Sequence, residues 1–203
     1  VGQSRVVHHL QKDVEDIGMS LLDLVEHDHS VRRLEHRIGQ QTALVEPYVA
    51  FKKNWQRDQN RGSVKVRTSD MDRIKIGDKE IFMEVFSEEL ESGGYTLANE
   101  RAEDVLIVKP AIIDLDVNAP DIMTAGRTNT YTDSAGSMAL YIELYDSETD
   151  DLLAKALDKK ADRQHSYMQW QTGPANRAAA KRMMKSWAEA LREGLDAAHK
   201  HIG

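Results

Sequence analysis

The chain has 203 residues, of which 40% are hydrophobic and 30% are charged, and its formal net charge is −7. This composition is typical of a folded globular protein rather than a disordered chain. The negative charge argues against a nucleic-acid binder, because neutralisation of phosphates supplies most non-specific affinity for nucleic acids. The sequence contains no cysteine, which excludes disulfides, thiolate zinc sites and thiol nucleophiles. No run approaches the ~20 apolar residues that span a bilayer.

Residues 1–40 are predicted to form a helical appendage to a main domain at residues 41–203. Apolar residues recur in the appendage at spacings of three and four, as on one face of an amphipathic helix: Leu10, Val14, Ile17, Leu21 and Leu24. Asp28 occupies the next position of this stripe, so we expect the helix to end near Glu26 and a short second helix to follow. So few heptads do not make a stable coiled coil, and the appendage is expected to pack on the main domain or on a neighbouring subunit.

The main domain is predicted to begin with a strand, a helix and a second strand. Residues 47–55 (PYVAFKKNW) alternate as a strand does, with three large apolar side chains on one face: Val49, Phe51 and Trp55. The following helix is expected to end at SGG, residues 92–94, since glycine suits the left-handed position after a helix. Residues 104–117 are rich in β-branched side chains, which indicates an interior strand. Because a crossover joins parallel strands, we expect these two strands to be parallel.

Two more strands and a long helix complete the predicted domain. Residues 137–146 alternate between apolar and polar side chains, and residues 151–160 follow after a polar turn, which predicts an antiparallel hairpin. The last helix is expected to begin near Pro174, because proline is favoured in the first turn. We therefore predict an α/β (α+β) two-layer sandwich with a mixed sheet, in the order β-α-β-β-β-α, with two helices on one face and an N-terminal helical appendage.

The most acidic stretch is YIELYDSETDDLL, residues 141–153, which raises the possibility of a metal site. A calcium loop that starts at Asp146 needs glycine at its sixth position and glutamate at its twelfth. The chain has Asp151 and Leu157 there, so both requirements fail. We interpret the stretch as a solvated hairpin turn whose short polar side chains hydrogen-bond their own backbone, with a weak cation site as the alternative.

The histidines do not have the spacing of a zinc site. Five of them lie near the start of the chain: His8, His9, His27, His29 and His36. Neighbouring residues on a helix point apart, so HH and HDH cannot chelate one ion, and the same holds for His199 and His201. We predict surface histidines, with pH-sensitive packing of the appendage as a second reading, and we expect no metal and no cofactor.

Motifs for nucleophilic catalysis are not evident in the sequence. The chain has neither a Gly-x-Ser-x-Gly elbow nor a glycine-rich loop that opens a helix. A Ser–His–Asp triad is defined by geometry rather than by spacing, so it stays open as an alternative that would depend on His165.

Two features suggest contact with a partner. The run NRAAAKRMMK, residues 176–185, either is the solvated face of an amphipathic helix or forms a positive docking surface for an acidic partner. Aromatic residues in the loop before it either pack under the sheet edge or contact a partner or ligand. These features give the candidate partner-binding residues: Tyr167, Trp170, Lys181, Arg182 and Lys185.

Several stretches resemble a known family: EPYVAFKKNW, the block from SDMDRI to VLIVKPAIIDL, and ALYIELYDSETDDLLAKALDKKAD. They are similar to the bacterial lipoproteins grouped as domain of unknown function 3313, over about residues 42–200. Asp150 stands where the family hairpin usually has glycine, and residues 1–38 do not match the family pattern. The fold resembles the amino-terminal domain of the Tol-system propeller protein and the lipoprotein activators of penicillin-binding proteins, which bind other proteins.

The resemblance implies export to the periplasm and attachment to the outer membrane through a lipidated cysteine, which this sequence lacks. The first residue is Val1 rather than Met, as expected of a processed or trimmed product. We expect a non-enzymatic envelope lipoprotein that acts as a protein-interaction or structural module at the periplasmic face. Expected partners are other envelope proteins or a second copy bound through the N-terminal helices, with no nucleic acid. The alternatives are a metal-assisted hydrolase using His165 with a nearby carboxylate, and a cytoplasmic small binding protein.

Overall fold

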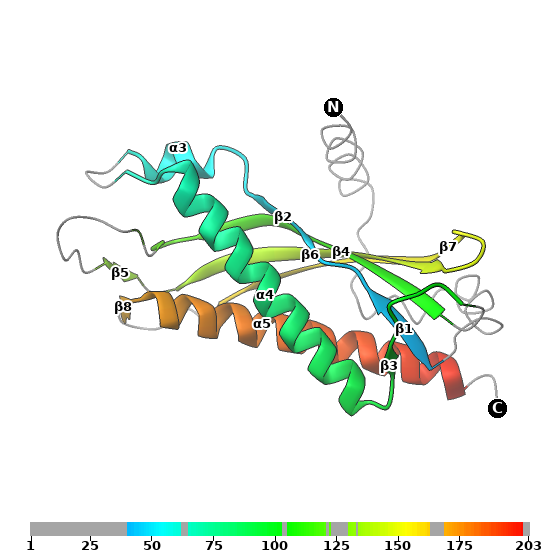
Figure 1. Ribbon diagram of the computed structural model, residues 1–203. Coiled ribbons are helices and arrows are strands. Elements are labelled where there is room, and N and C mark those ends of the chain that lie inside the picture. The colour runs from blue at the N-terminus through cyan, green and yellow to red at the C-terminus, as the bar shows by residue number, and fades with distance from the viewer. Residues whose placement is uncertain are drawn as a thin grey trace.

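The computed structural model describes residues 40–61, 65–102, 105–120, 122, 130–132, 134–162 and 169–200. The predicted N-terminal helices, and every histidine except His199, therefore lie outside the described residues. The described part is a mixed α+β structure, as predicted, built around a six-stranded sheet (Figure 1).

The long strand β4 organises the sheet (Figure 1). Two short strands, β1 and β2, lie parallel to successive parts of β4 along one of its edges. β6 pairs antiparallel with the other edge of β4, and β7 pairs antiparallel with β6. β3 adds to β1, and β5 pairs with β8 in a separate two-stranded sheet. The bounds of the strands are β1 Gln41–Leu44, β2 Tyr48–Phe51, β3 Thr96–Leu97, β4 Val105–Val117, β5 Thr130–Thr132, β6 Gly136–Asp146, β7 Leu152–Ala161 and β8 Gln169–Gln171.

Two long helices, α4 (Thr68–Ser92) and α5 (Gly173–Lys200), cover one face of the sheet (Figure 1). The two helices run in the same direction. Lys181 of α5 contacts Glu84 of α4, and Arg192, farther along α5, contacts Glu89, farther along α4. In Figure 1 the helices lie close together over the sheet and diverge toward their N-terminal ends. That divergence opens a cavity between the two helices.

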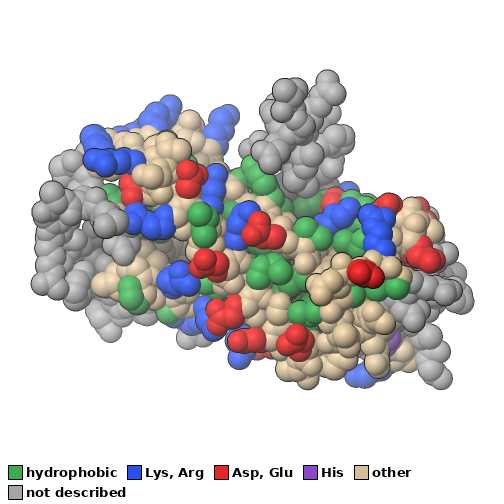
Figure 2. All heavy atoms as spheres, in the orientation of Figure 1, with side chains coloured by type: hydrophobic (Ala, Val, Ile, Leu, Met, Phe, Trp, Pro, Cys, Tyr) green, Lys and Arg blue, Asp and Glu red, His purple; other side chains and the backbone are tan. Residues whose placement is uncertain are grey.

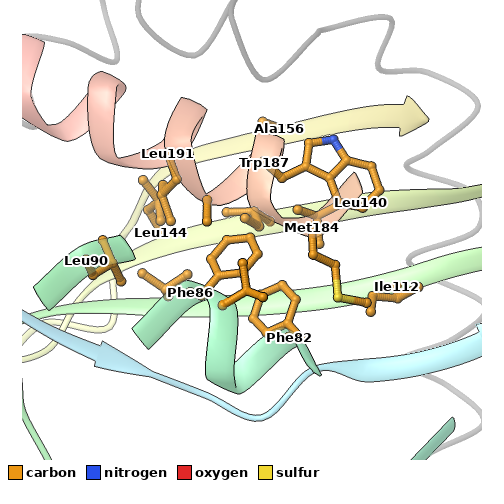
Figure 3. Close-up of a cluster of buried hydrophobic side chains, with 14 of the residues drawn as sticks. Phe82, Phe86, Leu90, Ile112, Leu140, Leu144, Ala156, Met184, Trp187 and Leu191 are labelled. Atoms are coloured by element: carbon orange, nitrogen blue, oxygen red, sulfur yellow. The ribbon is translucent and has the colours of Figure 1, made fainter. Parts of the chain in front are cut away.

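The core fills the space between these helices and the sheet (Figure 3). The rings of Phe82 and Phe86 on α4 stack with centroids 3.9 Å apart. Trp187 and Met184 on α5 are completely buried, and Figure 3 shows these side chains over Leu140 of β6. Full burial of each such side chain stabilises the fold by about 1.5–3 kcal/mol, so this contact fixes both helices on the sheet.

The predicted parallel pairing of β2 with β4 and the predicted β6–β7 hairpin are present. One expectation is wrong: the first strand does not continue to Trp55. It ends at Phe51, because Asn54 adopts a left-handed conformation (φ 64°) and Trp55 begins a short helix, α3 (Trp55–Gln59). The Trp55 ring still stacks on Phe51, with centroids 4.2 Å apart, and its indole N–H donates to the carbonyl of Val117.

The acidic stretch is a hairpin turn between β6 and β7. One carboxylate oxygen of Asp146 accepts hydrogen bonds from the backbone N–H groups of Glu148 and Thr149, both at 2.9 Å. Asp150 has φ 56°, the left-handed conformation that glycine adopts most easily. The turn is less solvated than expected, since Asp146 and Ser147 are buried. Ser147 hydrogen-bonds the backbone of Ala102 rather than its own turn.

A bulge near the end of β4 shapes the sheet beside the helices. The pairing of β4 with β6 shifts register between Ile113 and Asp116, and Asp114 within this bulge has φ 51°. Gly136 faces the bulge with φ 141°, and a Cβ there would lie 1.9 Å from the carbonyl oxygen of Asp116. Only glycine permits this approach of the two strands.

The variant Gly136→Ala should therefore lower the free energy of unfolding by about 2 kcal/mol or more, because the added methyl group collides with backbone. Gly94→Ala is the matched control: Gly94 also has a positive φ, of 89°, but a Cβ added there would meet no atom within 4 Å. It should lose only about 1 kcal/mol from backbone strain. Urea unfolding of both variants measures the difference, and equal losses would contradict the contact argument.

Candidate functional site

A cavity of about 240 Å³ lies where α4 and α5 diverge above the end of β4 and the start of β6. We call it the α4–α5 cleft. Its walls are mostly apolar and come from both helices and the sheet: Ile74 and Ile81 of α4, Ala179, Ala180 and Met183 of α5, Leu115 and Val117 of β4, and Met138 of β6. Gly136 and the β4 bulge form its floor, so the same distortion that forces glycine there also shapes the cleft.

Small residues keep the cleft open. On α4, Gly77 lines it at a position where a Cβ would meet only the guanidinium end of Arg177, at 3.3 Å. On α5, Ala179 and Ala180 stand one to two turns before the bulky Met184 and Trp187. Small side chains near the N-terminal ends of both helices therefore leave space that aromatic side chains fill farther along.

Asp78 is the unusual group in the wall of the cleft. It belongs to α4, is 8% exposed, and its Oδ2 has no hydrogen-bond partner. Burial raises the pKa of its carboxyl to about 7, and the positive charge of Arg177 opposes this shift without cancelling it. An acid that is buried without a full set of partners is costly to the fold, which makes Asp78 a candidate functional residue.

Besides Asp78, five polar side chains line the cleft: Arg73, Asp116, Ser137, Asn176 and Arg177. Asn176 donates from Nδ2 to the carbonyl of Ala119 at 2.8 Å, while its Oδ1 is buried without a partner. Arg177 lies 3.9 Å from Glu80, and Arg73 pairs with Asp70 in the first turns of α4. Chemically, the cleft offers a mostly apolar chamber with a few polar groups in its wall, which suits an apolar group that carries a polar end.

The sequence contained a signal for Asp78 that pattern reading missed. The apolar stripe of α4 runs through Ile74, Ile81 and Val85, and Asp78 falls within it, one turn before Phe82. A charged residue inside an apolar stripe is either paired or functional. Asn176 likewise occupies the core-facing side of α5, one turn before Ala180. For both Asp78 and Asn176, the signal in the sequence is a polar residue at a core-facing helix position, rather than a motif.

The residues predicted to bind a partner are not gathered at this cleft. Tyr167 lies outside the described residues, and only the backbone of Trp170 is described, paired in β8. Lys181 pairs with Glu84 at 2.6 Å and Lys185 approaches Glu189 at 4.0 Å. In Figure 2, red and blue side chains are interspersed over the helices, so the basic run does not stand alone on the face drawn.

Arg182 has a structural contact. Its guanidinium donates to the carboxylate of Asp162 at 2.7 Å, and the Asp162 side chain is only 5% exposed. The other carboxylate oxygen of Asp162 accepts from the backbone N–H of Ala135. Arg182 therefore ties α5 to the end of β7, and Asp162 links that point to the chain between β5 and β6.

His199 differs from the prediction of a surface histidine. Its Nε2 is buried without a partner, and its Nδ1 lies 2.9 Å from the carbonyl of Leu195 and 3.2 Å from the hydroxyl of Tyr95. The Tyr95 hydroxyl donates to Asp196, which also accepts from Arg192. These contacts join the C-terminal ends of the two helices.

No group of three or more His, Asp or Glu side chains in the described ranges is placed to hold a metal ion. Among the helices that the structure describes, none has the length and apolar character needed to cross a membrane.

A family model described as "Protein of unknown function (DUF3313)" matches residues 41–191. The chain belongs to the DUF3313 family. The match confirms the family resemblance that the sequence motifs indicated, and it begins where β1 begins. The comparison with curated proteins finds no match for this DUF3313 protein.

Solved structures show only distant similarity to this chain. The PelC dodecamer from Paraburkholderia phytofirmans is 12% identical, with a TM-score of 0.38, over 75% of this chain and 89% of that chain. Protein XCC0632 from Xanthomonas campestris, of family DUF330, is 14% identical, with a TM-score of 0.43, over 81% and 89% of the two chains. At these TM-scores, the likeness carries no argument about function.

Asp78 makes the stability of this DUF3313 protein depend on pH. Its pKa is 3.8 ordinarily and about 7 in the folded protein, so between these values the folded state holds a proton that the unfolded chain has lost. The free energy of unfolding should therefore fall as pH rises from about 4 to about 7. Asp78→Asn cannot ionise and should be more stable than the wild type at pH 8 by roughly 2–4 kcal/mol.

Urea unfolding from pH 5 to pH 8 measures this effect. Asp72→Asn, at an exposed position of the same helix, is the matched control and should follow the wild type across the range. A pH profile of Asp78→Asn that parallels the wild type would show that Asp78 ionises normally.

Proposed function

We propose that this protein is a non-enzymatic binding protein of the cell envelope, and that the α4–α5 cleft receives an apolar side chain of a partner protein. One observation carries the proposal: a largely apolar cavity of about 240 Å³ with the buried carboxyl of Asp78 in its wall. Concave apolar sites with a few placed polar groups are the usual form of binding sites in proteins.

The side chains around the cleft suit holding a group better than transforming one. General acid–base chemistry and nucleophilic attack need two or three side chains within hydrogen-bonding reach of each other and of a substrate. In the described wall of the cleft, Asp116 is engaged by Lys52 at 2.9 Å, and Asp78 has an oxygen without a partner. What Asp78 supports is recognition of a hydrogen-bond donor that enters with the apolar group.

The size of the cleft supports a side chain rather than a large cofactor as the occupant. Pockets for drug-sized molecules have volumes of about 300–1,000 Å³, so a cavity of about 240 Å³ falls below that range. A single aromatic or long aliphatic side chain fits such a space. Binding of that kind anchors many protein interfaces, where a few buried side chains carry most of the affinity.

The proposed location rests on the family. The resemblance of the sequence to envelope lipoproteins supports export and attachment to the outer membrane from the periplasmic side, and the family itself is shown for residues 41–191. We accordingly propose that the partner is another envelope protein, which the cleft would meet on the side of the helices.

The cleft can be tested with indole, which mimics an aromatic side chain with a hydrogen-bond donor. Saturable shifts are expected for the backbone amide signals of Met138 and Met183, on opposite walls of the cleft, in two-dimensional NMR spectra of the full chain. Gly77→Trp should abolish these shifts, because its side chain grows into the cleft from α4.

Gly77→Ala is the matched control for this test. Replacement of a helical glycine by alanine favours the helix by about 1 kcal/mol, so the fold should be kept, and the small methyl group leaves the chamber open. The control should bind indole as the wild type does. Equal indole shifts in the wild type and in Gly77→Trp, or none in the wild type, would reject the cleft as the binding site.

The proposed location has its own test. In cells of the native organism, the protein should sediment with the outer membrane and should be released by detergent but not by high salt, as a lipid anchor requires. Recovery in the soluble cytoplasmic fraction would contradict this part of the proposal while leaving the cleft experiment unaffected.

A further inference from the structure

The sheet has a second face, turned away from α4 and α5. We call it the outer face. In β4 and β6 the side chains alternate, and those of the core cluster all belong to the helix side: Leu106, Val108, Ile112, Leu140, Ile142 and Leu144. The outer face is made by the residues between them and by their partners in β1 and β7: Ala43, Val105, Ile107, Lys109, Ala111, Ala139, Tyr141, Glu143, Tyr145, Lys155, Leu157 and Lys159.

The centre of the outer face is buried, although both long helices lie on the other side (Figure 1), whereas its surrounding residues are partly or fully exposed. Tyr141 is 2% exposed and Ile107 is 6% exposed, and Val105, Ala111 and Ala139 are equally hidden. A tyrosine ring on an open sheet keeps at least one side in water, because neighbouring strands shield only its edges. The small residues beside Tyr141, such as Ala111, cannot hide its ring. These exposed fractions require a cover over the centre of the outer face, around Tyr141.

The polar groups of the outer face are arranged for such a cover. Glu143 accepts a hydrogen bond from the hydroxyl of Tyr141 and another from that of Tyr145, each at 2.8 Å. The ammonium group of Lys109 lies over the ring of Tyr145, 3.9 Å from its centroid. Because the hydroxyls of Tyr141 and Tyr145 and the carboxylate of Glu143 have partners within the sheet, these three groups can be covered without the cost of unsatisfied hydrogen bonds.

We propose that the amphipathic segment at residues 10–24 of the same chain covers the outer face. The apolar stripe of this segment, from Leu10 to Leu24, needs an apolar surface. As a helix it would be about 22 Å long, which fits within the roughly 36 Å length of β6. The occupant and the site thus match in length and in apolar character.

The path of the chain brings the segment to this site. The chain enters the sheet at Gln41, which lies opposite Val105 of the outer face in the parallel β1–β4 pair. Residues 25–40 link the segment to that point, and a chain of that length spans far more than the width of the sheet. The segment can therefore reach the outer face.

Charge also favours this docking. Asp13 borders the apolar stripe of residues 10–24, which contain four acidic side chains and one lysine: Lys12, Asp13, Glu15, Asp16 and Asp23. The outer face carries three lysines and one glutamate: Lys109, Lys155, Lys159 and Glu143. An acidic segment laid along this lysine-rich face is electrostatically complementary. The docked segment would complete a third layer and leave the α4–α5 cleft free for its own ligand.

The absence of cysteine gives a clean test, because an introduced thiol is the only one in the chain. Ala139→Cys places a thiol on the outer face at a 5% exposed position. In the full chain this thiol should react slowly with a maleimide. A second change of Ile17 and Leu21 to Asp should break the stripe and speed the reaction at least tenfold.

Two controls distinguish loss of the cover over the outer face from unfolding of the domain. Met19→Asp makes the same chemical change on the opposite side of the predicted helix and should leave the thiol of Ala139→Cys protected. Ala156→Cys reports on the helix side of the sheet, where the residue is completely buried, and should stay protected in every background. Rapid labelling of Ala139→Cys in the unmodified background, or no acceleration when the stripe is broken, would overturn the proposal.

The same thiol distinguishes the segment of one chain from that of a second copy. If the cover belongs to the same chain, protection of Ala139→Cys should not change on dilution, and sedimentation should not depend on the integrity of the stripe. Protection that disappears on dilution together with a dimer would show that a second copy supplies the segment, which would also overturn the proposal.

Discussion

The packing of Phe82, Phe86, Met184 and Trp187 against the sheet is the contact on which the rest of the structure depends. These side chains draw α4 and α5 together over the middle of β4 and β6 (Figure 3). Beyond them, the pairing of Arg192 with Glu89 holds the later parts of the helices at fixed distance. Straight helices that converge at one end must separate at the other, because side-chain ridges set a fixed crossing angle. The α4–α5 cleft is the consequence of that geometry.

The cleft exists because several features of the chain agree. Gly77, Ala179 and Ala180 remove bulk from the helices where they diverge, and Gly136 lets β6 approach the bulged end of β4. Burial of Asp78 destabilises the fold, because its carboxyl loses solvation and one of its oxygens has no hydrogen-bond partner. Buried ionisable groups in cavity walls are commonly functional, and the position of Asp78 therefore supports the proposed binding role of the cleft.

The two faces of the sheet differ in composition and in role. The helix side contributes the aromatic core and the cleft, whereas the outer face carries a hydrogen-bonded centre formed by Tyr141, Glu143 and Tyr145. A strand buried on both sides reads as continuously apolar, which is how residues 104–117 appeared in the sequence. The burial of both faces therefore explains the composition of β4 and gives the N-terminal segment a proposed place in the fold.

Much of the architecture could be predicted from the sequence, because local patterns determine local structure. The β6–β7 hairpin followed from alternation, the end of α4 from its glycines, and the start of α5 from Pro174. The short strands β1 and β3 could not be predicted, since two to four residues carry too little pattern and owe their conformation to pairing with a neighbour. The break at Asn54 depended in the same way on one left-handed residue.

The sequence by itself determined the family, the two long helices, and the strands β2, β4, β6 and β7. Only the tertiary structure decided that Asp78 is buried, that Gly136 is required by a carbonyl of β4, and that Arg182 is engaged by Asp162. The physical reason is that burial, pKa and close contact depend on residues far apart in the chain, which periodicity along one segment does not describe. A cleft between two helices is a property of their crossing, and neither helix encodes it alone.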